Sequence, residues 1–243
     1  MYKYVIPSLI PVVGFFIRGI SGFGSALIIT PLLLFFYDLR TVVSVVAILE
    51  IISTAYFTIE VFKDVDWRYI KSLLPISVIG IAVGAFFLIN IKTDLLKSIF
   101  GVFVVLFAIR IFIINIKSFG YIRRRWPHSI AYIAGELAGL LGGLYGTAGP
   151  PVTILLENQM DSKINLRATL TFYFYMVDII RIVPYFYVGM IGKEQLKISA
   201  ILLPAAFVGM IAGRLVYLKF SEVFFRIIVG IILLASGILL AVF

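Results

Sequence analysis

At residues 142–151 the chain reads Gly-Gly-Leu-Tyr-Gly-Thr-Ala-Gly-Pro-Pro, inside an apolar segment that runs from about residue 129 to residue 156. Its glycines and its two adjacent prolines leave too few hydrogen-bonded turns for a continuous helix. Unwound backbone at membrane depth is tolerated only where protein or a water-filled cavity satisfies the freed amide groups. A weaker break, Ser-Gly-Phe-Gly-Ser at 21–25, interrupts the first apolar segment. Such paired breaks indicate a transporter's binding site.

The composition is that of an integral membrane protein. Of 243 residues, 62% are hydrophobic and 14% are charged, whereas a soluble domain carries about 25% charged residues. The apolar runs have the length of membrane-spanning helices and are too long for the strands of an outer-membrane barrel. We therefore expect an all-α, multi-pass protein of the cell (plasma) membrane.

The net charge of +9 indicates orientation in the bilayer rather than nucleic-acid binding. Lys and Arg lie mainly in the short links between apolar segments, where they orient the chain and meet anionic lipid. The densest group, Lys117 with Arg123, Arg124 and Arg125, has no flanking fold that could present it to DNA or RNA. The expected partners are the lipid bilayer and a small anion, and a homo-oligomer is left open.

The chain contains two internal repeats of about four apolar segments each, with the first segment of each repeat broken. A Leu-Pro pair and three glycines recur at one spacing in both halves: Leu74, Pro75, Gly80, Gly84 and Gly101 correspond to Leu203, Pro204, Gly209, Gly213 and Gly230. Self-similarity of this kind indicates duplication. We assign residues 1–115 to the first membrane repeat, 116–128 to a basic linker and 129–243 to the second membrane repeat.

The orientation of the repeats depends on whether the broken segments cross once or fold back. The arms of the first segment, about 4–20 and 24–37, would together be about 50 Å long, too long for one straight crossing of a core about 30 Å thick. Folding back gives each half an odd number of crossings and places a larger excess of Lys and Arg on one side. We therefore favour inverted repeats.

These breaks carry a family resemblance. The glycine-rich break, followed by Leu166 and Arg167, resembles the second-repeat signature of the TauE/SafE sulfite exporter family, and Gly14 with Ser-Gly-Phe-Gly at 21–24 and Pro31 resembles its first-repeat counterpart. The resemblance covers nearly the whole chain and implies a permease for small anions such as sulfite, sulfonates or sulfur-containing organic acids. Ala148 stands where the family often has glycine, and the first break lacks a Pro-Pro, so the substrate stays open.

A half-helix that starts at a break presents free N–H groups and the positive end of its dipole, which favours an anion. If the breaks meet, two such ends face one point. The candidate substrate-binding residues are Arg18, Ser21, Gly22, Gly24, Ser25, Gly143, Tyr145, Gly146, Thr147, Gly149 and Pro150. Arg18 could instead satisfy the last carbonyls of its own half-helix, and close helix packing is the alternative for the glycines.

Two acidic residues, Glu50 and Asp178, fall near mid-membrane in corresponding segments. An ionised carboxylate there costs about 3 kcal/mol or more, so each should face the protein interior or take up a proton. Asp178 and Arg181 could form an ion pair on one helix, for coupling or for structural neutralisation. Glu50 has no basic residue within one turn, so its coupling role is the more testable.

We do not expect an enzyme, a metal or a cofactor, because the sequence has no metal-binding cluster, P-loop or dinucleotide fingerprint. Two alternatives to transport stay open. Gly-Ile-Ser-Gly at 19–22 matches the short motif of an intramembrane serine protease with Ser21 as nucleophile, but the base would have to be His128, at a segment boundary. A structural membrane subunit would not explain duplicated breaks and buried acids.

Overall fold

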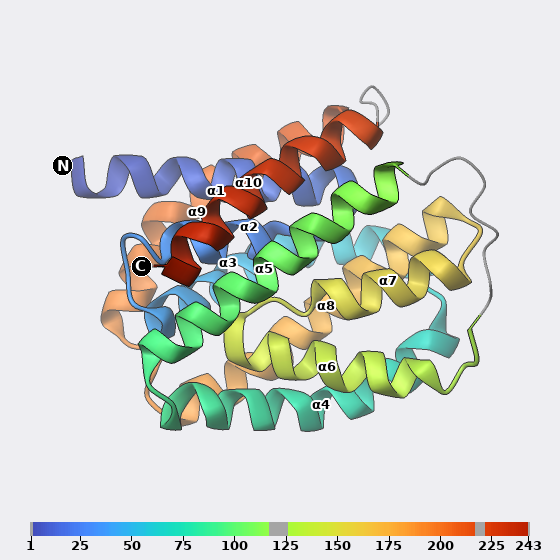
Figure 1. Ribbon diagram of the computed structural model, residues 1–243, viewed down its shortest axis with the longest axis horizontal. Coiled ribbons are helices and arrows are strands. Elements are labelled where there is room, and N and C mark those ends of the chain that lie inside the picture. The colour runs from blue at the N-terminus through green and yellow to red at the C-terminus, as the bar shows by residue number, and fades with distance from the viewer. Residues whose placement is uncertain (1, 117–125, 217–221, 243) are drawn as a thin grey trace.

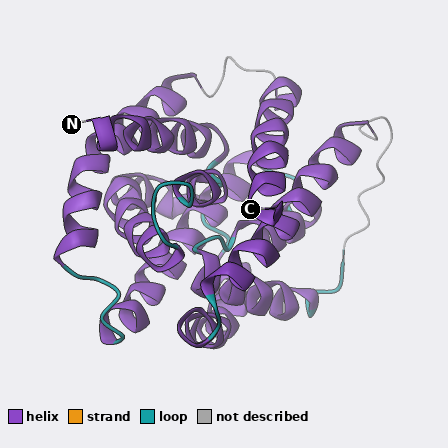
Figure 2. Cartoon of the chain, turned by 60° about the vertical axis from the view of Figure 1, so that its left-hand side comes forward, coloured by secondary structure: helices purple, strands orange, loops and turns teal. Residues whose placement is uncertain are grey.

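The computed structural model describes residues 2–116, 126–216 and 222–242, and within these ranges it is built from helices with no strand. Short loops connect the helices (Figures 1 and 2). The all-α class expected from the sequence is confirmed. Residues 117–125 of the expected basic linker lie outside the described residues.

The helices of the first half are α1 (Tyr2–Ser21), α2 (Ser25–Leu33), α3 (Leu39–Val61), α4 (Trp67–Asn90) and α5 (Thr93–Ile116), with a 3-10 turn, η1 (Phe62–Asp64), before α4. Those of the second half are α6 (Ile130–Tyr145), α7 (Gly149–Gln159), α8 (Lys163–Tyr187), α9 (Lys193–Val216) and α10 (Glu222–Val242). Polar side chains cap the starts of three of them, α3, α4 and α8, and the Asp66 carboxylate accepts the Arg68 N–H at 3.0 Å at the start of α4. The Asp38 carboxylate accepts the Thr41 N–H at 3.0 Å at the start of α3, and the Ser162 hydroxyl accepts the Asn165 N–H at 3.3 Å at the start of α8.

Four stretches of helix in the described residues are long and apolar enough to cross a membrane: Leu39–Asp64, Trp67–Asn90, Thr93–Ile113 and Lys193–Val216. Three further apolar stretches, counted over residues whose side chains are described, are shorter: Ile6–Ser21, Ile130–Tyr145 and Val229–Ala241. The sequence predicts about eight segments of roughly membrane-spanning length, and four of the helical stretches in the described residues meet this length and hydropathy. The broken segments at 4–37 and 129–157 each divide into two shorter helices.

The helices on either side of the first break pack against each other. The backbone of Gly14 in α1 contacts the Ile29 side chain in α2. In one continuous straight helix these residues would be about 22 Å apart, so α2 folds back along α1. In the second half, α7 likewise contacts α6.

Glycines allow two of the closest helix contacts, and both join one half of the chain to the other. Gly80 and Gly84 of α4 lie against the backbone of α6, and Gly209 and Gly213 of α9 lie against the backbone of α1. With no Cβ between them, the helices approach closely, which is the packing role expected for these glycines. Each hairpin therefore packs on a helix of the other half, while α5 and α10 pack together (Figure 1).

Candidate functional site

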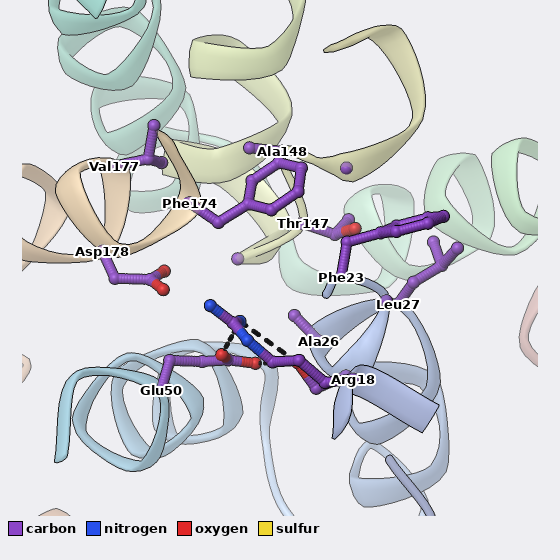
Figure 3. A pocket seen from close by; sticks show the side chains of 14 residues that line it. Arg18, Phe23, Ala26, Leu27, Glu50, Thr147, Ala148, Phe174, Val177 and Asp178 are labelled. Atoms are coloured by element: carbon purple, nitrogen blue, oxygen red, sulfur yellow. Dashed lines mark hydrogen bonds and ion pairs between the residues drawn. The ribbon is translucent and has the colours of Figure 1, made fainter. Parts of the chain in front are cut away.

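A cavity lies where the two breaks meet, between α3 and α8 (Figure 3). Its lining combines both breaks with side chains of these two helices: Arg18, Phe23, Gly24, Ser25, Ala26, Leu27, Glu50, Gly146, Thr147, Ala148, Gly149, Phe174, Val177 and Asp178. The cavity volume is about 20 Å³, which is room for about one water molecule. The cavity is therefore too small, as it stands in this structure, for more than about one water molecule.

The first break consists of three residues between α1 and α2. Gly22 and Gly24 have φ of 81° and 93°, in the left-handed region that favours glycine. The next residue, Ser25, opens α2, and the N–H groups of the first turn of α2 have no partner within the helix. These N–H groups and the dipole of α2 place a positive end at the cavity wall.

The second break has the same form but offers fewer donors. Gly146 has φ of 74° and ends α6, with its N–H bonded to the Gly142 carbonyl at 3.0 Å. Helix α7 then begins at Gly149, followed by Pro150 and Pro151, which have no N–H. The double proline therefore stops α6 from continuing, and it leaves Gly149 as the amide donor of the first turn of α7.

Four buried charged residues surround the cavity, two positive and two negative. Arg18 forms an ion pair with Glu50, and its Nη1 also donates to the Ser25 hydroxyl at 3.3 Å. The Ser25 hydroxyl in turn donates to the other oxygen of Glu50. On α8, Arg181 Nη2 lies 2.8 Å from Asp178 Oδ1. All four residues are at most 5% exposed, so a charge left without a partner would be costly.

The two arginines keep donors free. Arg18 Nε and Nη2, and Arg181 Nε and Nη1, have no hydrogen-bond partner among the described residues. The Arg181 guanidinium lies against Gly146 at the second break. Most buried polar groups are paired, so a group of unpaired guanidinium nitrogens beside a cavity indicates a place for an anionic ligand.

The structure brings six of the eleven candidate substrate-binding residues to the cavity: Arg18, Gly24, Ser25, Gly146, Thr147 and Gly149. The other five do not line it. The hydroxyl of Ser21 lies 2.8 Å from the Ile17 carbonyl and 2.7 Å from that of Phe23. Gly22 packs against Arg167 and Gly143 against Ile81. Tyr145 stacks on Phe100.

Pro150 is buried at the start of α7 and is also not part of the lining. Of the expected coupling residues, Glu50 and Asp178 line the cavity, and Arg181 lies directly behind Asp178. The ion pair considered between Asp178 and Arg181 is present.

The apolar residues that line the cavity were not predicted from the sequence. Phe23 of the first break and Phe174 of α8 pack with ring centroids 6.4 Å apart, and Phe23 also lies near Gly149. Phe174 and Val177 stand one turn from Asp178 and Arg181 on α8. The helical spacing of three to four residues would have placed all four on one face.

The protease alternative has no support in the geometry. The Ser21 hydroxyl is bound to backbone carbonyls of its own segment, as described above. The His128 ring nitrogen Nε2 lies 2.7 Å from the Ser72 hydroxyl, on α4. A nucleophile needs a base within hydrogen-bond reach, and Ser21 has none among the described residues.

Comparison with known proteins decides the family. The profile described as "Sulfite exporter TauE/SafE" matches residues 8–240. The chain belongs to the TauE/SafE family. It is therefore a membrane transporter rather than an enzyme, and the expected multi-pass location in the cell membrane is confirmed.

Two relatives of this TauE/SafE protein are named as transporters. A "Probable sulfite/organosulfonate exporter TauE" of Cupriavidus necator is 22% identical over 229 residues, covering 90% of this chain and 88% of the relative. A "Probable inner membrane transporter protein TsaS" of Comamonas testosteroni is 24% identical over 178 residues, covering 73% of each chain. No solved structure matches the chain significantly.

Proposed function

We propose that this protein is a secondary transporter of small oxyanions, with sulfite, sulfonates and related sulfur-containing organic anions as the substrate class. The observation that carries the proposal is a set of guanidinium nitrogens with no hydrogen-bond partner among the described residues: those of Arg18 at the cavity where the two breaks meet, and those of Arg181 next to Asp178. The name of the Cupriavidus necator relative, a probable sulfite/organosulfonate exporter, supports the choice of anion.

The cavity is suited to such an anion in its donors and its shape. Guanidinium groups bind oxyanions with paired, charge-assisted hydrogen bonds, and the N-terminus of α2 adds backbone N–H groups on another side. The rings of Phe23 and Phe174 give the cavity an apolar part beside this charged part. The substrate-binding residues we propose are Arg18, Gly24, Ser25, Gly146, Thr147 and Gly149, with Arg181 as a further donor.

We also propose that transport is coupled to protons through the buried carboxylates of Glu50 and Asp178. Both line the cavity, from two different helices, α3 and α8 (Figure 3). An anion that enters a site already holding two carboxylates meets like charges in a region of low dielectric, which favours protonation of one of them.

The helix pairings support duplication with inverted repeats, with residues 1–115 and 129–243 as the two units. The pairing of α1 with α9 corresponds to that of α6 with α4, and α3 with α8 and α5 with α10 complete the set. Each hairpin is packed by glycines on a helix of the other half. We propose that alternating access keeps these two glycine contacts and changes the contacts across the cavity, rather than rocking one sequence half against the other.

Counterflow in proteoliposomes tests this function. Vesicles loaded with unlabelled sulfite or ethanesulfonate should take up the labelled form of the same anion well above empty vesicles, and acetate should compete less. Uptake no greater than in protein-free vesicles for sulfite, ethanesulfonate and a short sulfur-containing carboxylate would reject the proposal.

A further inference from the structure

The two buried carboxylates at the cavity are not equally free to change their charge. Both oxygens of Glu50 are engaged, one by Arg18 and one by the Ser25 hydroxyl. Asp178 pairs with Arg181 through Oδ1, while its Oδ2 has no partner among the described residues. In Figure 3 the Asp178 carboxylate faces the Arg18 guanidinium across the cavity, with no interaction drawn between them. Asp178 therefore holds an acceptor that is free on the cavity side.

The charges around the cavity sum to zero when all four groups are ionised, because Arg18 and Arg181 balance Glu50 and Asp178. A monovalent oxyanion bound to the free nitrogens of the two arginines would leave one uncompensated negative charge in a site at most 5% exposed. An uncompensated charge in such buried surroundings raises the free energy of the site. Uptake of one proton neutralises that charge.

From this geometry we infer that Asp178, rather than Glu50, carries the coupled proton, and that one proton loads with each monovalent anion so that the loaded site is neutral. The inference rests on the proposed function and deepens it. On loading, an O–H bond forms at Asp178 Oδ2 with a proton from the water on that side, and the new O–H donates to an oxygen of the anion. On release, that bond breaks and the proton leaves with the anion.

The groups that face Asp178 favour this step only when the anion is present. They are Arg181 on its own helix, Arg18 from α1 and Glu50 from α3, with the uncharged Thr147 from the second break. Tyr185, farther along α8, interacts electrostatically with both Asp178 and Arg181. Arg18 and Arg181 attract the negative charge of Asp178. A bound anion offsets their positive charge, so proton and anion bind cooperatively.

Accumulation of ethanesulfonate in proteoliposomes tests the inference, because a sulfonate does not titrate near neutral pH. With the membrane potential held at zero, an interior one pH unit more alkaline than the outside should accumulate the anion about tenfold, the ratio set by one proton per anion. A membrane potential without a pH gradient should drive no accumulation. Accumulation that follows the potential, or that ignores the pH gradient, would overturn the inference while leaving transport itself established.

Two variants show which of the two carboxylates takes up the coupled proton. Asp178→Asn is neutral at every pH, so whatever exchange of ethanesulfonate remains in this variant should be uncoupled, and its accumulation ratio should fall from about tenfold to one. Whatever flux remains in Glu50→Gln should still reach about tenfold per pH unit. The reverse pattern would assign the proton to Glu50 and overturn the inference.

A measurement on the wild-type protein keeps the test independent of how well the variants fold. Ethanesulfonate added to the purified, weakly buffered protein should cause uptake of about one proton per anion bound. Binding without proton uptake would contradict the inference. If the wild-type protein neither binds nor exchanges sulfite or ethanesulfonate, the proposed function fails, and the inference fails with it.

Discussion

Arg18 has two roles at the cavity. Its Nη1 pairs with Glu50, and its Nε and Nη2 have no hydrogen-bond partner in the part of the chain that the structure describes. We predict that Arg18→Lys retains the charge but loses the fork of donors. Loss of one charge-assisted hydrogen bond costs about 1.5–3 kcal/mol, so the affinity for sulfite should fall about 10- to 100-fold. Competition for ethanesulfonate counterflow measures that affinity.

Arg214→Lys is the matched control for this prediction. Arg214 pairs with Glu60 at the surface, where the two side chains are 41% and 44% exposed, and exposed pairs contribute little. Equal affinities for sulfite in the two variants would mean that Arg18 does not contact the anion.

The two serines of the first break should behave differently. The Ser25 hydroxyl lines the cavity and orients Glu50, whereas the Ser21 hydroxyl bonds to backbone carbonyls. We predict that Ser25→Ala lowers kcat/KM for ethanesulfonate exchange by about tenfold, the cost of one hydrogen bond to a charged group. Ser21→Ala should stay within about twofold of the wild type. A larger loss in Ser21→Ala than in Ser25→Ala would place the substrate elsewhere in the break.

Sequence reasoning at the residue scale worked where partners are close along the chain. The pair of Asp178 and Arg181 is visible from a spacing of three residues on a helix. The pair of Arg18 and Glu50 joins two helices separated by a break and a loop. Spacing along the chain gives no sign of such a pair, so Glu50 was expected to have no basic neighbour on its helix, and its partner from α1 was missed.

At the scale of elements, Gly146 links the path of the chain to the position of Arg181. Its φ of 74° is unfavourable for alanine, and a Cβ there would meet the Arg181 guanidinium. We predict that Gly146→Ala lowers the free energy of unfolding by about 1–2 kcal/mol through the backbone, and also lowers ethanesulfonate exchange at least about tenfold by displacing Arg181. Thermal unfolding and counterflow of the same preparation measure the two effects.

Gly189 provides the control for that prediction. Its φ is 72°, and a Cβ there would meet nothing within 4 Å, so Gly189→Ala carries the backbone strain alone. It should lose a similar amount of stability and keep its exchange rate. Parallel loss of exchange in both variants would show that strain, rather than the position of Arg181, controls transport.

The positions of glycine and proline predicted where the helices would end. They did not predict how many free N–H donors the next helix would present at its start. From the sequence, the half-helices after the two breaks were expected to present N–H donors equally. Pro150 and Pro151 remove the donors of the first turn of α7 after Gly149, whereas the first turn of α2 has no proline. The residue types that make the second break so recognisable also weaken it as a binding surface.

At the scale of the whole molecule, the chain is held together by contacts that cross between its halves. The sequence shows corresponding glycines in the two halves, but a repeat pattern does not say whether glycines pack within a repeat or between repeats. Gly80 and Gly84 meet α6, and Gly209 and Gly213 meet α1. These contacts between the halves oppose a motion in which each half rocks as an intact unit.

Cross-linking can test which contacts change during transport, because the chain has no cysteine. We predict that a short thiol cross-link between Ser72→Cys and His128→Cys, which joins α4 to the start of α6 where the native side chains lie 2.7 Å apart, leaves ethanesulfonate exchange intact. The same reagent between Phe23→Cys and Phe174→Cys, across the cavity, should abolish exchange, and cleavage of the link should restore it. Loss of exchange from the first link alone would show that α4 and α6 must separate.

The position of a bound anion tests most directly whether the two breaks form the transport site. Selenite has the pyramidal shape of sulfite, and its selenium atom gives an anomalous diffraction signal that locates it in crystals of the wild-type protein. We predict one strong selenium peak beside the guanidinium groups of Arg18 and Arg181 and the N-terminus of α2, and no such peak in Arg18→Lys. A protein that exchanges selenite yet shows the selenium only outside this cavity would contradict the proposed site.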